Sequence, residues 1–139
     1  MSFELLPTGS ADAAQIAEWI AADPDHQDKP VAEDFFMTGA PGSFLVFKVT
    51  DTEGIVFYVR FDPDTDKKVR MHTQFSPGNV SKKRVVMAIL GTLPKVIERL
   101  KIDFSGIVYE SVSPTLIAWM SLNFRFKRVE GTSDYALQF

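Results

Sequence analysis

Three consecutive cations, Lys82-Lys83-Arg84, directly follow Ser81. Serine is favoured just before a helix, so these cations would occupy the first turn of one. The helix macrodipole favours anions there, and each exposed cation costs roughly 0.3–1 kcal/mol. The cluster therefore predicts an anion site, where a pyrophosphate, a phosphate or a nucleic-acid backbone binds across the exposed N–H groups. The alternative is a solvated basic turn that is screened by salt or paired with nearby Asp and Glu.

A second polar group lies in the alternating run from 69 to 75, where Arg70, His72 and Gln74 share one face of a predicted strand. Glu110, in a later strand-like run, could join them across a sheet. An imidazole or a carboxylate can take a proton from an attacking amine, directly or through water. His72 and Glu110 are therefore candidate catalytic bases. The alternative for His72 is an ordinary hydrogen-bonded strand residue.

The run Asp62-Pro63-Asp64-Thr65-Asp66 resembles the opening of a calcium loop. An EF-hand needs Gly next and Glu at the twelfth position, where this sequence has Lys67 and Thr73. We therefore expect a solvated turn and no metal centre. The chain has no cysteine, which excludes thiolate nucleophiles and Cys-based zinc sites.

The composition is that of an ordinary globular protein, with 139 residues, of which 45% are hydrophobic and 24% charged. It predicts a single domain over residues 1–139. A net charge of −3 argues against a nucleic-acid partner, although it is compatible with a local basic patch. No signal-peptide pattern starts the sequence, and no apolar run approaches the ~20 residues that a membrane span needs. We expect a cytoplasmic protein without a membrane partner.

Hydrophobic periodicity and turn residues predict strands at 2–6, 44–49, 55–61, 69–75, 106–112, 124–129 and 135–139, and helices at 13–20, 30–37, 82–100 and 114–122. Pro94 lies inside the longest helix and removes one backbone hydrogen bond, so we expect a kink there or a break at Gly91-Thr92. Aromatic residues on and before the central strands are predicted to form core rather than a base-stacking platform. They are Phe35, Phe36, Phe44, Phe47, Phe57, Tyr58 and Phe61.

The order of these elements resembles the N-acetyltransferase (GNAT) superfamily over nearly the whole chain. The end of the chain is the most specific part, because the family has a strand, a short helix and then a Gly-Phe pair that opens the next strand. Asn123-Phe124 stands at the position of that pair, and Asn best tolerates the positive φ of a helix-ending glycine. The resemblance implies an α/β (α+β) fold with a mixed, mostly antiparallel sheet of about seven strands, flanked by about four helices.

The resemblance also implies an activity, the transfer of an acetyl or similar acyl group from acetyl-CoA to a primary amine by direct attack. The pantetheine would lie between the strands at 69–75 and 106–112. The family often has a Tyr acid on the short helix, where this chain has Trp119 or Met120. Tyr109, on the preceding strand, would be the substitute acid.

The family binds the coenzyme A pyrophosphate on a glycine-rich loop before the long helix. Lys83 and Val85 stand about where that loop has its glycines. On the resemblance, the cofactor-binding residues would be Phe75, Gly78, Asn79, Val80, Ser81, Lys82, Lys83, Arg84 and Trp119.

Two further functional hypotheses remain open from the sequence. One is a non-catalytic GNAT-like binding or assembly protein, for example of phage or virion origin. The other, weaker one is a nucleic-acid-binding module that uses the basic turn. The acceptor amine is not identified. A last strand ending at Phe139 could pair with another chain, which predicts a homodimer.

Overall fold

The structure is a computed structural model that describes residues 2–23, 32–77, 81–110 and 114–139. Within these residues, seven strands form one sheet in the order β1-β2-β3-β4-β5-β7-β6, and only β4 and β5 pair in parallel. The strands are β1 (Glu4–Leu6), β2 (Leu45–Asp51), β3 (Gly54–Pro63), β4 (Lys68–Phe75), β5 (Gly106–Glu110), β6 (Lys127–Arg128) and β7 (Asp134–Gln138). The helices are α1 (Ala13–Ala22), α2 (Lys82–Leu100) and α3 (Pro114–Phe124). The predicted mixed, mostly antiparallel sheet is confirmed.

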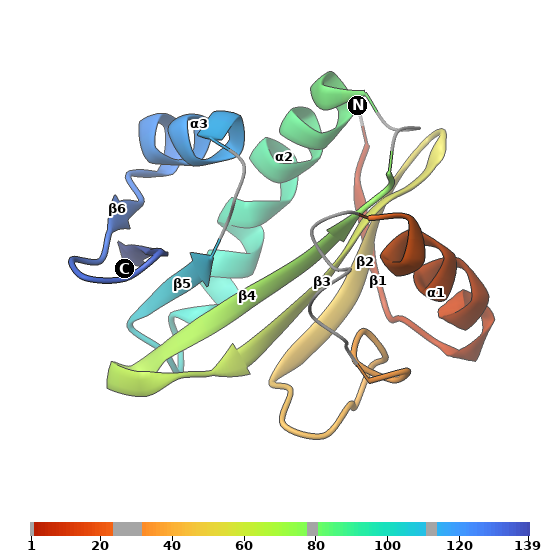
Figure 1. Cartoon of the computed structure of the whole chain (residues 1–139), viewed down its shortest axis with the longest axis horizontal. Helices are drawn as coiled ribbons and strands as arrows, with labels where there is room; N and C mark the ends of the chain where they lie inside the picture. The colour runs from red at the N-terminus through yellow and green to blue at the C-terminus, as the bar shows by residue number, and fades with distance from the viewer. Residues whose placement is uncertain (1, 24–31, 78–80, 111–113) are drawn as a thin grey trace.

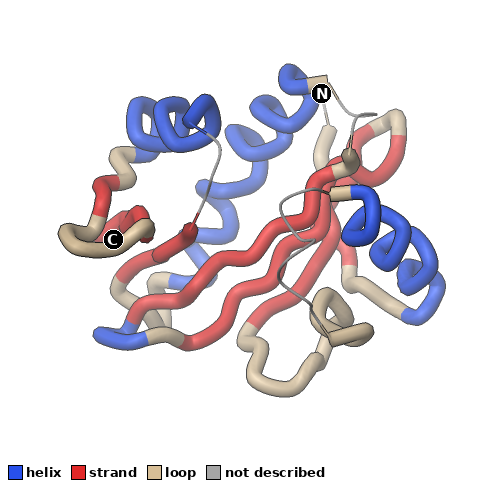
Figure 2. The backbone as a smooth tube through the Cα atoms, viewed as in Figure 1, coloured by secondary structure: helices blue, strands red, loops and turns tan. Residues whose placement is uncertain are grey.

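Helices cover both faces of the sheet, with α1 on one face and α2 and α3 on the other (Figures 1 and 2). Covering both faces explains why β3 is almost continuously buried, and why its sequence is an apolar run rather than an alternation. In β4 the alternation is retained. Val69, Met71 and Phe75 contribute to the core beside α2, so Arg70, His72 and Gln74 lie on the face of α1.

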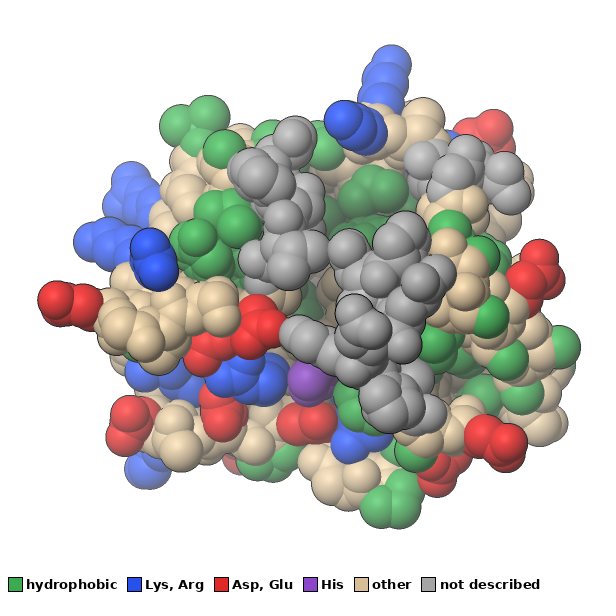
Figure 3. Space-filling view, in the orientation of Figure 1, with side chains coloured by type: hydrophobic (Ala, Val, Ile, Leu, Met, Phe, Trp, Pro, Cys, Tyr) green, Lys and Arg blue, Asp and Glu red, His purple; other side chains and the backbone are tan. Residues whose placement is uncertain are grey.

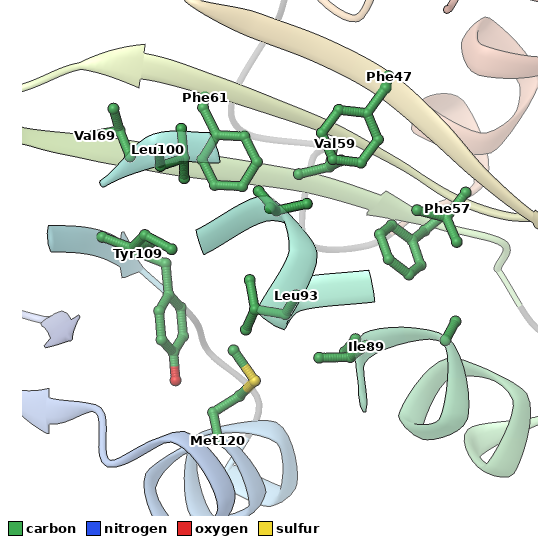
Figure 4. Close-up of a cluster of buried hydrophobic side chains, with 14 of the residues drawn as sticks. Phe47, Phe57, Val59, Phe61, Val69, Ile89, Leu93, Leu100, Tyr109 and Met120 are labelled. Atoms are coloured by element: carbon green, nitrogen blue, oxygen red, sulfur yellow. The ribbon is translucent and has the colours of Figure 1, made fainter. Parts of the chain in front are cut away.

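Two apolar clusters fill the space between these layers. The larger one lies between the sheet and the helices α2 and α3 (Figure 4). The smaller one is built from Ile16, Phe36 and Tyr58 beneath α1. The aromatic residues predicted as core all belong to these clusters or pack against them, which confirms that prediction.

The predicted helix at 30–37 is wrong over the residues that the structure describes, 32–37. Phe35 N–H donates to Ala32 O and Met37 N–H to Asp34 O, which are the hydrogen bonds of turns rather than of an α-helix. Phe36 is buried in the smaller cluster, so the tertiary contacts of this segment outweigh its helix propensity. The described chain accordingly has three α-helices instead of about four.

Of the two alternatives at Pro94, the break at Gly91-Thr92 is wrong, because α2 continues through Pro94, and the kink stays a prediction. Val96 and Leu100 lie beyond the proline and are buried in the larger cluster. Burying such side chains contributes roughly 1.5–3 kcal/mol each, which offsets a proline cost of about 3 kcal/mol.

The helix-ending residue with positive φ is Arg125 (φ 62°), not Asn123. Asn123 is inside α3, and its side-chain amide donates to Trp119 O at 2.9 Å. Phe126, which follows Arg125, is buried in the larger cluster. The residue with positive φ and the phenylalanine that follows it are therefore Arg125 and Phe126, two residues later than the Asn123-Phe124 pair that the sequence predicted.

This correction also shortens the strand predicted at 124–129, because α3 extends to Phe124 and β6 comprises only Lys127 and Arg128. The last strand, β7, is not a free edge, because it lies between β5 and β6. β6 pairs with Tyr135 and Ala136 of β7, and the homodimer stays a prediction.

Candidate active site between diverging strands

The strands β4 and β5 part in the middle of the sheet. Their parallel pairing consists of Lys68 with Gly106, Val69 with Ile107 and Arg70 with Val108. Beyond Arg70, β4 continues to Phe75 and leads toward α2, while the chain after β5 leads to α3 (Figure 1). The β5 side of β4 from Met71 to Phe75 has no strand partner among the described residues. Backbone groups inside a sheet need partners, so this edge can receive an extended ligand.

An ion pair holds the point where the strands part. Arg70 reaches across β5 and donates from both terminal nitrogens to Asp134 of β7, at 2.9 Å each, and also to Asp64 at 3.3 Å. The hydrogen bonds to Asp134 raise the pKa of Arg70. The same contact holds the pKa of Asp134 below its ordinary value. This ion pair between Arg70 and Asp134, the Arg70 clamp, therefore joins β4 to β7 at all ordinary pH values.

His72 and Glu110, the two candidate bases, lie on the same face of the sheet as this clamp. His72 is the register partner of Arg60 in β3. Glu110 faces Asp134 across the β5–β7 pair, and Ser133 Oγ donates to Glu110 Oε2 at 3.4 Å. Acidic and basic side chains adjoin on this face of the molecule (Figure 3). The structure thus places the predicted polar set on the α1 face.

His72 is half-buried among charged and aromatic groups. Its Nε2 lies 3.4 Å from Asp62 Oδ2, and its ring meets the edge of Phe35 at a centroid distance of 5.1 Å. Burial lowers the pKa of His72, and the positive charges of Arg60 and Arg70 act in the same direction against the opposing effect of Asp62. The imidazole is therefore neutral at pH 7, which is the state that can accept a proton.

Tyr109 lies on the opposite face of the sheet from Glu110, its neighbour in sequence. It is 3% exposed and belongs to the larger apolar cluster, and its ring points toward α3 near Met120 (Figure 4). Its hydroxyl has no hydrogen-bond partner within the described part of the chain. Burial, with a smaller effect from Tyr135, raises the pKa of Tyr109 to about 12.

The predicted basic turn opens α2. Ser81 is the N-cap, because its Oγ accepts from Arg84 N–H at 3.2 Å. Arg84 turns back to the β2–β3 hairpin and donates to both oxygens of Asp51, at 2.8 and 2.7 Å. Its guanidinium is thus already paired, and it lowers the pKa of Asp51. Lys82 and Lys83 are exposed and make no ion pair within residues 2–23, 32–77, 81–110 and 114–139. An anion would be attracted mainly by these two lysines and the helix N-terminus.

The remaining residues predicted to bind the cofactor lie in different parts of the fold, and three of them lie outside the described residues. Phe75 ends β4, and its ring packs on Phe57 at a centroid distance of 5.5 Å. Trp119 is half-buried on α3 against Phe124. Val85, at one of the family's glycine positions, packs against the larger cluster, so its side chain does not stand over the start of α2. Gly78, Asn79 and Val80 lie outside the described residues.

Sequence reasoning missed the partners of these residues. Asp134 and Asp51 follow no motif, and Arg70 and Asp134 are 64 residues apart. Only the fold shows that they meet. Within the described ranges, no cluster of three or more His, Cys, Asp or Glu side chains could hold a metal ion. The same ranges contain no helix that is both long and apolar enough to cross a membrane.

A mixed sheet that opens between two parallel neighbours, with helices on both faces, is the architecture of the GNAT acetyltransferases. No family model and no curated protein sequence matches the chain, but solved structures do. A GNAT-family acetyltransferase from Staphylococcus aureus superposes with a TM-score of 0.71 at 12% identity, and the match covers 99% of both chains.

Two further neighbours were solved with the coenzyme. The aminoglycoside acetyltransferase AAC(6')-Ib, in complex with coenzyme A, has a TM-score of 0.75 at 11% identity and covers 99% of this chain and 95% of its own. A putative acetyltransferase from Salmonella typhimurium, with acetyl-CoA, has a TM-score of 0.65 at 17% identity and covers 99% and 94%. The chain therefore has the GNAT fold.

Proposed function

We propose that the protein is an acyl-CoA N-acyltransferase that transfers an acetyl group from acetyl-CoA to a primary amine. The observation that carries the proposal is the short β4–β5 pairing, which leaves the β5 side of Met71–Phe75 open for an extended chain. The pantetheine of the donor has that shape and offers amides to the strand. Neighbours with this fold were solved with coenzyme A or acetyl-CoA, which supports the same ligand here.

In this arrangement the residues of the chain have distinct tasks. Lys82, Lys83 and the start of α2 would attract the phosphates of the donor. The amine would approach from the α1 face, where His72 or Glu110 takes its proton. The amine nitrogen forms a bond to the acyl carbon, the C–S bond breaks, and coenzyme A leaves as a thiolate.

Acetyl-CoA is expected to stabilise the protein against heat. A ligand at about 100 times its Kd contributes about 2.7 kcal/mol, which corresponds to several degrees in Tm for a domain of this size. Lys82→Ala/Lys83→Ala should weaken binding roughly tenfold, because two exposed ion pairs are lost. Differential scanning fluorimetry and calorimetric titration measure both effects.

The matched control for these lysines is Lys95→Ala/Lys127→Ala, which removes two exposed cations from elsewhere on the surface. It has the same net charge as the test variant and should bind acetyl-CoA like the parent protein. No rise in Tm at millimolar acetyl-CoA would refute the proposal. Equal weakening by both double variants would show that the effect is one of overall charge.

The fall of kcat/KM at acid pH is expected to follow the protonation of His72. A protonated imidazole cannot accept a proton, so activity falls as the pH drops through the pKa of this residue. Burial lowers that pKa from its ordinary value of 6.5, so the acid limb of kcat/KM should lie below pH 6.5. His72→Gln should abolish this limb and lower kcat by roughly 10²–10⁴-fold.

Coenzyme A release can be followed with a thiol reagent, because the protein has no cysteine. Ribostamycin, the ligand of an AAC(6')-Ib neighbour, and spermidine serve as probe amines. An unchanged acid limb in His72→Gln, together with a large loss in Glu110→Gln, would assign the base to Glu110 instead.

A further inference from the structure

Gln74 of β4 has a buried side-chain oxygen without a partner. The residue is 1% exposed, and its Oε1 accepts no hydrogen bond within the part of the chain that the structure describes. Buried polar atoms are nearly always hydrogen-bonded, because an unpaired one loses its contact with water without compensation. The oxygen therefore points to a donor that a bound molecule would supply.

The two N–H groups of the same side-chain amide are already used. Nε2 donates to Asp23 Oδ2 at 3.1 Å and to the backbone oxygen of Phe75 at 2.8 Å. Turning the amide over would place Oε1 against these two acceptors, so the partners fix its orientation. Gln74 therefore presents only a hydrogen-bond acceptor, and the group that binds it must carry an N–H or an O–H.

The bond to Phe75 places this amide at the open edge of β4. Lys68, the first residue of β4, directs its carbonyl toward β3, where it accepts from Asp64 N–H at 2.7 Å. The residues of an antiparallel ladder alternate between hydrogen-bonded and non-hydrogen-bonded pairs, and the β3–β4 register is regular up to Phe75.

Phe75 lies an odd number of residues after Lys68, so its carbonyl points away from β3. That side of β4 is the one without a strand partner among the described residues. Because Oε1 and Nε2 of Gln74 share one carbon, Oε1 lies within about 5 Å of the Phe75 oxygen. The unpaired oxygen is thus close to the opening where the acyl donor is proposed to lie.

Gln74 is also on the side of the sheet from which the amine would approach. It lies two residues beyond His72 on the α1 face of β4. A neutral primary amine has two N–H groups beside its lone pair. When its nitrogen attacks, one N–H proton goes to the base and the other N–H stays in the amide product. A secondary amine has only one N–H, and the base removes it.

We propose that Gln74 Oε1 accepts a hydrogen bond from the N–H that the attacking amine keeps, and so selects primary over secondary amines. This inference rests on the proposed acyltransferase function. The nitrogen forms a bond to the acyl carbon, the other N–H proton passes to His72 or Glu110 directly or through water, and the electron pair of the C–S bond stays on sulfur. Gln74 neither gives nor takes a proton, and Asp23 holds its amide in place.

The test compares methylamine with dimethylamine as acceptors at saturating acetyl-CoA. Gln74→Met keeps the length of the side chain and removes the amide. It should lower kcat/KM for methylamine about tenfold, the effect of losing one hydrogen bond, and leave kcat/KM for dimethylamine unchanged. The matched control is Gln15→Met, which removes an amide that donates to Tyr58 Oη at 3.2 Å beneath α1. It should change neither value.

The pantetheine of the acyl donor also carries N–H groups, and the same variants distinguish this source. Weaker acetyl-CoA binding by Gln74→Met, with the amine preference retained, would assign Oε1 to a pantetheine amide and overturn its role in amine selection. Equal losses with methylamine and dimethylamine would overturn that role as well. Failure of acetyl-CoA to raise the Tm of the parent protein would refute the acyltransferase proposal itself.

Spermidine gives a second measurement, which needs no variant and holds even if Gln74→Met does not fold. The molecule carries two primary amines and one secondary amine. Mass spectrometry of the products of the parent protein should find acetyl groups on the terminal nitrogens alone. Acetylation of the secondary nitrogen at a comparable rate would overturn the inference. Binding of acetyl-CoA without transfer to either methylamine or spermidine would overturn it too, and would leave cofactor binding standing.

Discussion

Gly106→Ala is expected to destabilise the protein by about 3 kcal/mol, the upper part of the range for overpacking substitutions. A Cβ at Gly106 would lie 2.3 Å from the backbone oxygen of Leu137 and 3.5 Å from the Cα of Gln138. Backbone atoms of β7 cannot rotate away as the end of a side chain can, so either β5 or β7 must shift. Gly106 also pairs with Lys68 at the base of the diverging strands, so the shift would reach the candidate site.

Urea unfolding gives the free energy for Gly106→Ala, and Gly9→Ala is the matched control. Gly9 has an extended backbone with φ −126°, and a Cβ there would meet no atom within 4 Å. The control should change stability by no more than about 0.5 kcal/mol. Equal stability of the two alanine variants would show that β7 can move aside without cost.

Asp12→Ala is expected to cost about 3 kcal/mol, the lower end of the range for breaking a buried ion pair. Both oxygens of Asp12 accept from Lys48 Nζ, at 2.9 and 3.0 Å, and the carboxylate also accepts from Tyr58 Oη at 3.2 Å and from Gly9 N–H at 3.0 Å. The substitution leaves these donors unpaired beneath α1. The side chain of Lys48 is 20% exposed and can reach water in part, so we expect a cost at the lower end of the range for a buried ion pair.

An exposed pair provides the comparison for Asp12. The side chains of Arg99 and Asp103 are each 52% exposed, and Arg99 Nη1 lies 3.3 Å from Asp103 Oδ2 on the surface. Asp103→Ala should therefore cost no more than about 1 kcal/mol in the same unfolding experiment. A cost for Asp12→Ala as small as that of Asp103→Ala would mean that water replaces the carboxylate.

The Asp12 contribution also has a pH signature. Burial would raise the pKa of Asp12, but the hydrogen bonds from Gly9 and Lys48 outweigh it, so the pKa lies below 3.8. A carboxyl group with a depressed folded-state pKa contributes stability above its unfolded value and loses it as the pH falls through the folded value. The difference between the parent protein and Asp12→Asn should therefore shrink below pH 3.8.

The elements that the sequence predicts well are those with local patterns. The stripe of α2, the apolar run of β3 and the alternation of β4 each follow from the burial of neighbouring residues. The segment at 32–37 failed because Phe36 is anchored by Tyr58 on the sheet, a contact that no local period shows. Arg125 was missed because a positive φ is rare for Arg, and the shift of two residues became visible only in the backbone.

In the candidate site, too, the features with a local sequence pattern were predicted and those that depend on non-local contacts were not. Strand periodicity was enough to put His72 on the polar face of its strand, and Glu110 lies on the same face of the sheet, where it faces Asp134. The clamp between Arg70 and Asp134 depends on β7 pairing with β5, which is a non-local event. The pairing of Arg84 with Asp51 likewise depends on where the β2–β3 hairpin meets α2. That the Tyr109 hydroxyl has no hydrogen-bond partner among the described residues could not be predicted from its residue type, because it depends on the surrounding side chains.

The short junction between β4 and β5 has a mechanical consequence. The sheet consists of a four-stranded part, β1 to β4, and a smaller part, β5, β7 and β6. Three residue pairs, the ion pair between Arg70 and Asp134 and the hydrogen bonds of Ser105 to Asp66 and Lys67 join the two parts. Few hydrogen bonds between strands oppose a separation of these parts, so residues 106–139, about a quarter of the chain, are held to the rest mainly by the larger apolar cluster that both parts share. An acyl donor bound along β4 would contact both parts of the sheet. Its binding would therefore make the two parts unfold together.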